Sequence, residues 1–125
     1  MIIIQQEMNQ KKLFNLLFAA LFFICCVNEV KIEGKWYVDK SQNENGRLKK
    51  SINKWIEFYS NGTLIGGKKE GSEIKKGIWK FDPKNNKLII DSKNRYGGEG
   101  IYTLEKLSQN EMILANDTIK VFFKK

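Results

Sequence analysis

The chain has 125 residues, of which 12% are aromatic and one is proline, and its formal net charge is +8, from 22 Lys and Arg against 14 Asp and Glu. This length leaves room for one domain with one modest core, and the composition favours a packed domain over a disordered chain. The sequence has no histidine, and its only cysteines are Cys25 and Cys26, which excludes a disulfide framework and zinc sites of the usual spacing.

The positive charge is compatible with nucleic acid, acidic glycans or an anionic membrane surface. Removing residues 1–25 would take away Lys11, Lys12 and Glu7 and leave 20 basic against 13 acidic residues, or +7. The basic residues are spread over turns and alternate strand positions, as on a solvated face. Charge by itself therefore identifies no partner.

The N-terminal segment has the pattern of a secretory signal peptide. Lys11 and Lys12 precede an apolar run over 13–27 that Asn15 interrupts, and this run is shorter than the ~20 apolar residues that a transmembrane helix needs. A retained membrane helix is the alternative. Met8 offers a second start for the same segment.

The end of this run resembles a bacterial lipoprotein signal peptide. Cys26 follows the small Cys25, whereas Cys25 follows the bulky Ile24, so the resemblance implies that Cys26 is lipid-modified. The alternative is that both cysteines only end a hydrophobic run. We expect a signal peptide over 1–25, an anchor linker over 26–33 and a barrel domain over 34–125, held at the cell envelope by a membrane anchor in either leaflet.

From residue 34 onward the pattern is period two with frequent turn residues, which predicts an all-β domain. A first strand over 34–39 is followed by a polar loop over 40–51, which is either a lid or a disordered connector. A second strand over 52–60 places Ile52, Ile56 and Phe58 on one face.

Turn residues set the pairing of the next strands. Asn61-Gly62 predicts a tight hairpin; a two-residue loop would pair Phe58 with Ile65, and a bulged turn would pair it with Leu64, which we favour. A later strand over 73–81 and an open turn after it predict Trp79 opposite Ile90 and Phe81 opposite Leu88. At the C-terminus, a two-residue loop at Asn116-Asp117 predicts Leu114 opposite Ile119 and Met112 opposite Val121.

These motifs together resemble the lipocalin-like domain proteins of Bacteroidetes envelopes. The resemblance rests on the lipoprotein-like leader and on the order of the motifs after it, which are Gly34-Lys35-Trp36, Ile56-Glu57-Phe58, Asn61-Gly62-Thr63, Gly77-Ile78-Trp79, 102–107 and Met112-Ile113-Leu114. It implies a small eight-stranded antiparallel up-and-down barrel of calycin type, with Gly34, Trp36 and Trp79 as barrel-closing residues. It also implies a hydrophobic ligand at the barrel mouth.

The predicted interior is rich in aromatic side chains. Since an eight-stranded barrel is just wide enough to be filled by its own side chains, a packed interior and a cavity are both open. The expected inward set is Trp36, Val38, Ile56, Phe58, Leu64, Trp79, Phe81, Leu88, Ile90, Tyr102, Leu104, Met112, Leu114, Ile119 and Val121.

The first functional hypothesis is an envelope lipoprotein that binds a small hydrophobic or amphipathic molecule. Its candidate ligand-binding residues are Phe58 and Tyr102 on strands, with Arg95 and Tyr96 in the glycine-rich segment 92–100. That segment precedes no helix, which argues against phosphate binding there. No cofactor or metal is expected.

The second hypothesis is a non-enzymatic envelope interaction protein. Its outward Tyr37, Trp55, Tyr59, Ile113 and Phe122, together with the basic loops, would contact a protein partner, glycan or anionic lipid. Catalysis is disfavoured because no histidine or facing carboxylate pair is evident, and nucleic-acid binding is disfavoured by the predicted secretion. The oligomeric state stays open.

Overall fold

The computed structural model describes most of the chain after the predicted leader. The predicted signal peptide and Cys26 lie outside the described residues, so those expectations stay predictions. Lys31–Lys125 form one compact unit. No helix in the described part of the chain is long and apolar enough to cross a membrane. The described ranges are 30–69, 74–93, 95–96 and 99–125.

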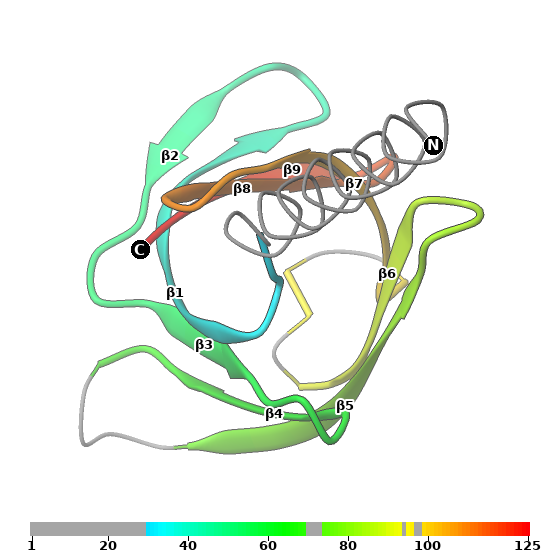
Figure 1. The fold of residues 1–125 in the computed structure, drawn as a ribbon. Helices are drawn as coiled ribbons and strands as arrows, with labels where there is room; N and C mark the ends of the chain where they lie inside the picture. The colour runs from blue at the N-terminus through cyan, green and yellow to red at the C-terminus, as the bar shows by residue number, and fades with distance from the viewer. Residues whose placement is uncertain (1–29, 70–73, 94, 97–98) are drawn as a thin grey trace, which may run out of the picture. The chain divides into compact units, whose positions relative to one another are not determined.

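The domain is an antiparallel barrel (Figure 1). Strands β1 and β3 to β9 pair in order, and β1 also pairs with β9, so eight strands close a circuit. The short β2 lies beside the second half of β1, outside this circuit. The predicted all-β, eight-stranded up-and-down barrel is therefore confirmed. The strands are β1 (Gly34–Asn43), β2 (Leu48–Lys50), β3 (Trp55–Phe58), β4 (Thr63–Gly67), β5 (Lys75–Asp82), β6 (Lys87–Ser92), β7 (Ile101–Leu107), β8 (Glu111–Ala115) and β9 (Ile119–Lys124).

Alternation along the strands builds the core inside the barrel. In β6, Leu88 and Ile90 are buried while Ile89 and Asp91 are exposed, as successive side chains of a strand point to opposite faces. Burying one such aliphatic side chain contributes ~1.5–3 kcal/mol. The buried cluster comprises Ile32, Trp36, Val38, Ile56, Phe58, Leu64, Leu88, Ile90, Tyr102, Met112, Leu114, Val121 and Phe123.

The up-and-down topology gathers the connections at two ends of the barrel. We call the end where β1 begins the base, and it also carries the β3–β4, β5–β6 and β7–β8 turns. The opposite end, here called the loop end, carries the β2–β3, β4–β5, β6–β7 and β8–β9 connections. Side chains at the two ends thus meet different surroundings.

Two predicted hairpin registers are confirmed. Phe58 pairs with Leu64, because Asn61 Oδ1 accepts a hydrogen bond from the Thr63 amide at 3.0 Å and Gly62 takes a φ of 86°. The β5–β6 hairpin sets Trp79 opposite Ile90, and Phe81 opposite Leu88, as the sequence predicts.

The prediction that Ile52 shares a strand face with Ile56 and Phe58 is wrong. Strand β3 begins at Trp55, and Ile52 is 81% exposed in the connection before it. Asn53 has a φ of 63°, a left-handed conformation that interrupts an extended strand. Consequently the alternation that includes Ile56 and Phe58 reaches back only as far as Lys54.

The predicted polar loop over 40–51 is wrong in part, since it contains a hairpin. β1 continues to Asn43, and β2 returns beside it with Gln42 opposite Leu48. Asn43 Oδ1 accepts hydrogen bonds from the amides of Asn45 at 3.0 Å and Arg47 at 2.9 Å. This side-chain turn nucleates a hairpin in a segment without apolar alternation.

The predicted register of the last hairpin is wrong by two residues. Leu114 pairs with Val121, and Met112 pairs with Phe123. Asn116 Oδ1 accepts from the Ile119 amide at 2.9 Å, so the turn is centred one residue later than the prediction. The shift keeps every side chain on its predicted face but brings Phe123, 2% exposed, into the core.

Candidate ligand-binding site at the loop end

Lys54 points into the barrel at the loop end. Its carbonyl oxygen accepts a hydrogen bond from the Val38 amide at 2.8 Å, which extends the β1–β3 ladder by one pair beyond Tyr37 and Trp55. Val38 is 3% exposed and faces the interior. Since directly opposite residues of a ladder share a face, the half-buried Lys54 side chain lies on the inner side.

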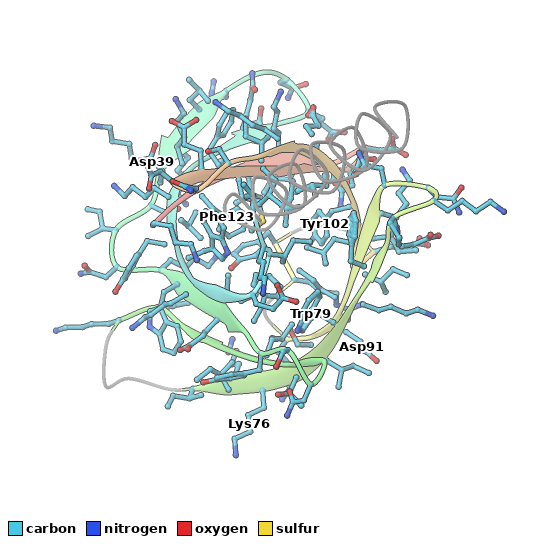
Figure 2. The ribbon with its side chains drawn as sticks, in the orientation of Figure 1. Asp39, Lys76, Trp79, Asp91, Tyr102 and Phe123 are labelled. Atoms are coloured by element: carbon cyan, nitrogen blue, oxygen red, sulfur yellow. The ribbon has the colours of Figure 1, made fainter. Side chains whose placement is uncertain are left out.

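Tyr96 lies over an aromatic surface within the barrel. Its ring packs edge to face on Phe123, with centroids 5.7 Å apart and planes at 78°. Its backbone amide donates a hydrogen bond to the Tyr102 hydroxyl at 3.0 Å. Figure 2 shows Tyr102 and Phe123 pointing into the barrel from β7 and β9. The β6–β7 connection thus places the Tyr96 ring on Phe123 and the Tyr96 backbone beside the Tyr102 hydroxyl.

The Lys54 ammonium lies 4.6 Å from the centroid of the Tyr96 ring. At this distance the negative face of the ring attracts the cation. The site therefore joins an apolar aromatic surface to a positive charge at the loop end of the barrel.

The electrostatic surroundings of this cation are unfavourable. Burial lowers the pKa of the Lys54 ammonium below its usual value, and the charges of Lys68, Lys75 and Lys49 lower it further. Among the described residues, no carboxylate forms an ion pair with Lys54. Burial, with a smaller contribution from Tyr102, raises the pKa of the Tyr96 hydroxyl, so this group stays neutral at physiological pH.

A close backbone approach fixes the start of β7 next to the site. The Gly100 carbonyl accepts a hydrogen bond from the Ile90 amide at 2.6 Å. A Cβ atom at position 100 would collide with the Ile90 carbonyl oxygen. Only glycine allows this approach without a backbone shift.

The four predicted ligand-binding residues separate in the structure. Tyr96 and Tyr102 come together at the site, whereas Arg95 is exposed. Phe58 lies at the base, where its ring packs edge to face on Trp79 with centroids 5.4 Å apart.

Sequence reasoning missed Lys54 and Phe123. Lys54 shares the alternation of Ile56 and Phe58, and Phe123 shares that of Val121. Strand parity could therefore have identified both residues.

The three predicted barrel-closing residues all lie at the base. Gly34 opens β1 with a φ of 117°, a conformation that favours glycine. Trp36 is fully buried, and its Nε1 donates to the Ile32 carbonyl at 2.8 Å. Trp79 Nε1 donates to a backbone carbonyl of the β3–β4 turn at 2.9 Å.

Ile32, within the predicted anchor linker, is itself part of the core.

Lysine side chains cover several outward aromatic rings. The Lys35 ammonium lies 4.6 Å from the Trp55 ring centroid and 5.4 Å from that of Tyr37. Lys40 lies 4.9 Å from the centroid of Phe122. Trp55 is only 6% exposed, and its Nε1 has no hydrogen-bond partner. Much of the outward aromatic surface expected from the sequence is thus covered within the domain.

Three surface grooves are recorded among the described residues, and one of about 330 Å³ is lined by Tyr37, Val38, Lys124 and 51–53. The other two lie on the outside of the barrel. One of about 420 Å³ is lined by outward residues of β6 to β8, including Lys87, Thr103 and Ala115. The other, about 430 Å³, is lined by Ile74, Lys75, Lys76 and Lys93. No cluster of metal-ligating side chains occurs in the part of the chain that the structure describes.

A closed antiparallel barrel with an aromatic interior has the architecture of lipocalin-like proteins. The fold is similar to that of a lipocalin-like protein from Bacteroides uniformis, at 20% identity and a TM-score of 0.63, over 75% of this chain and 97% of that chain. The resemblance predicted from the sequence is therefore confirmed for the fold.

Two further solved structures share this fold. An uncharacterized protein from Bacteroides eggerthii matches at 19% identity and a TM-score of 0.61, over 76% of this chain and 100% of that chain. A DUF4847 family protein from Bacteroides vulgatus matches at 14% and 0.53, over 74% of this chain and 92% of that chain. No family model and no curated protein matches the sequence.

Proposed function

We propose that this barrel is a non-enzymatic binding protein that takes up a small hydrophobic or amphipathic molecule at its loop end. The observation that carries this proposal is the aromatic surface of Tyr96, Phe123 and Tyr102 beside the inward Lys54. Aromatic and apolar linings with a few polar groups are typical of small-molecule sites.

Side chains of the strands fill the barrel interior. A ligand therefore enters by displacing a side chain. Met112, Leu114 and Val121 are fully buried in the middle of this core, and moving them would open the β8–β9 ladder. Tyr96 instead lies between β6 and β7, so its displacement would break no strand pairing. An apolar group in its place would contact Phe123 and Tyr102.

The proposal includes attachment to the cell envelope through lipid-modified Cys26. The lipoprotein-like end of the apolar leader supports this part. Intact mass measurement of protein from its native membrane tests it: we expect a diacylglyceryl mass at Cys26 that is lost in Cys26→Ser. An unmodified mature N-terminus would contradict the anchor while leaving the loop-end site unaffected.

A fluorescence titration with the neutral dye Nile red tests the loop-end site. Tyr96→Ala removes the ring from Phe123 and leaves an apolar cavity, and such cavities bind apolar molecules. We expect Tyr96→Ala to bind the dye more tightly than wild type does. Tyr59→Ala, which removes an exposed ring at the base, is the matched control. Equal dye binding by all three proteins would contradict the proposal.

A further inference from the structure

We infer that the bound molecule is an amphiphile with an anionic head group, such as a carboxylate, phosphate or sulfate, and that Lys54 binds this group. The inference rests on the proposed function, since the apolar part of the amphiphile must occupy the loop-end site.

The backbone geometry sets the direction of the Lys54 side chain. The hydrogen bond from the Val38 amide to the Lys54 carbonyl fixes Lys54 as the last inward residue before β3. Its alkyl stem therefore begins among core residues, and its ammonium ends over Tyr96, 4.6 Å from the ring centroid. A head group bound there would have its apolar chain directed toward Phe123 and Tyr102.

The charge at Lys54 lacks a strong partner in the described structure. The ion pairs that the structure records join Lys106 to Glu111, Lys120 to Glu105 and Lys124 to Asp39, all on other strands. The face of an aromatic ring attracts a cation only weakly at a partly exposed site. A half-buried ammonium therefore keeps most of its capacity for a charge-assisted hydrogen bond.

Neighbouring charges select the sign of the head group. Lys49, Lys68 and Lys75 lie close enough to Lys54 to disfavour its protonated form. The same field attracts an anion and repels a cation, and it acts more strongly near a low-dielectric interior than in water. A positively charged amphiphile would meet like charge at the loop end.

A series of decyl amphiphiles tests this inference by isothermal titration calorimetry. Decanoate, decan-1-ol and decyltrimethylammonium share one apolar chain, so differences in their affinity report the head group. We expect wild type to bind decanoate roughly 10- to 100-fold more tightly than decan-1-ol, as for a hydrogen bond to a charged group, and to bind the cation most weakly.

Three variants test whether Lys54 causes the preference for decanoate over decan-1-ol. Lys54→Met should bind decanoate within about threefold of decan-1-ol, and Lys54→Arg should keep the preference. Lys76→Met removes the same charge from an exposed side chain that points away from the barrel (Figure 2) and should also keep it. Equal binding of decanoate and decan-1-ol by wild type, or an unchanged preference in Lys54→Met, would overturn the inference alone. Failure of all three amphiphiles to bind would overturn the proposed function together with it.

Discussion

The ammonium of Lys54 lies 4.6 Å from the centroid of the Tyr96 ring, inside a barrel whose fully buried described side chains are hydrophobic. A half-buried cation without a carboxylate disfavours the folded state, because burial penalises the charged form. Binding sites commonly retain groups of this kind at a cost in stability. Lys54 therefore lowers the stability of the folded state and, in the proposed function, binds the ligand.

Lys54→Met should stabilise the protein in the absence of ligand. A gain of about 0.5–1 kcal/mol corresponds to a rise in Tm of roughly 2–8 °C for a domain of this size. Thermal unfolding followed by circular dichroism at neutral pH measures it, with Lys76→Met as the control for net charge. A lower Tm in Lys54→Met would show that the cation supports the fold.

The advantage of Lys54→Met should shrink at alkaline pH. The folded-state pKa of Lys54 lies below its unfolded value, so between the two values the unfolded chain holds the proton that the folded state has lost. Wild-type stability therefore rises with pH through this window, whereas Lys54→Met lacks this contribution. Urea unfolding at stepped pH measures the difference, and a constant gap between the two proteins would contradict the assignment.

Tyr96 should give the opposite dependence above pH 10. Its hydroxyl has a pKa raised by burial in the folded state, so the unfolded chain loses this proton first. Wild type should lose stability relative to Tyr96→Phe as pH rises, with a slope of at most about 1.4 kcal/mol per pH unit. Parallel stability curves for the two proteins would mean that Tyr96 ionises as easily when folded.

Two tryptophans should respond differently to loss of the indole N–H. Trp36→Phe removes the bond from Nε1 to the Ile32 carbonyl at 2.8 Å and opens space in the core, at a cost of ~1–3 kcal/mol. Trp55→Phe removes a buried N–H that has no partner, which offsets the packing lost and keeps the cost below ~1 kcal/mol. Urea unfolding provides both values. A larger loss for Trp55→Phe would contradict the hydrogen-bond assignments.

Gly100→Ala should destabilise the barrel and disturb the site. The new Cβ would collide with the Ile90 carbonyl oxygen, and the resulting backbone shift should cost ~1–3 kcal/mol. Because Gly100 directs the connection that carries Tyr96, Nile red binding should also change. Unaltered stability and dye binding would show that the β6–β7 connection relaxes freely around this position.

Local sequence signals predicted most of the barrel but left some registers open. The turn chemistry of Asn61 determined that Phe58 pairs with Leu64. In the last hairpin, a slip by two residues leaves every side chain on the same face, so alternation supports both registers equally. Only the bonds that Asn116 makes across its turn distinguish Val121 from Ile119 as the partner of Leu114.

The candidate site was harder to predict because it depends on tertiary contacts. A lysine in a strand is usually assigned to the solvent face. The left-handed conformation of Asn53, which ends the alternation before Lys54, has no signature in the sequence pattern. Tyr96 and Tyr102 were identified as aromatic candidates, but their association with Phe123 required the observed register of β9. The position of Phe58 at the base follows from the order of the strands.

We propose above all that an amphiphile takes the place of the Tyr96 ring, between the Lys54 ammonium and the side chains of Phe123 and Tyr102. Titration of isotope-labelled protein with decanoate, followed by two-dimensional NMR, tests it most directly. We expect saturable chemical-shift changes concentrated at these four residues, with little change at Phe58 in the base. Changes confined to the outer face around Lys35 and Trp55, or none at saturating decanoate, would contradict it.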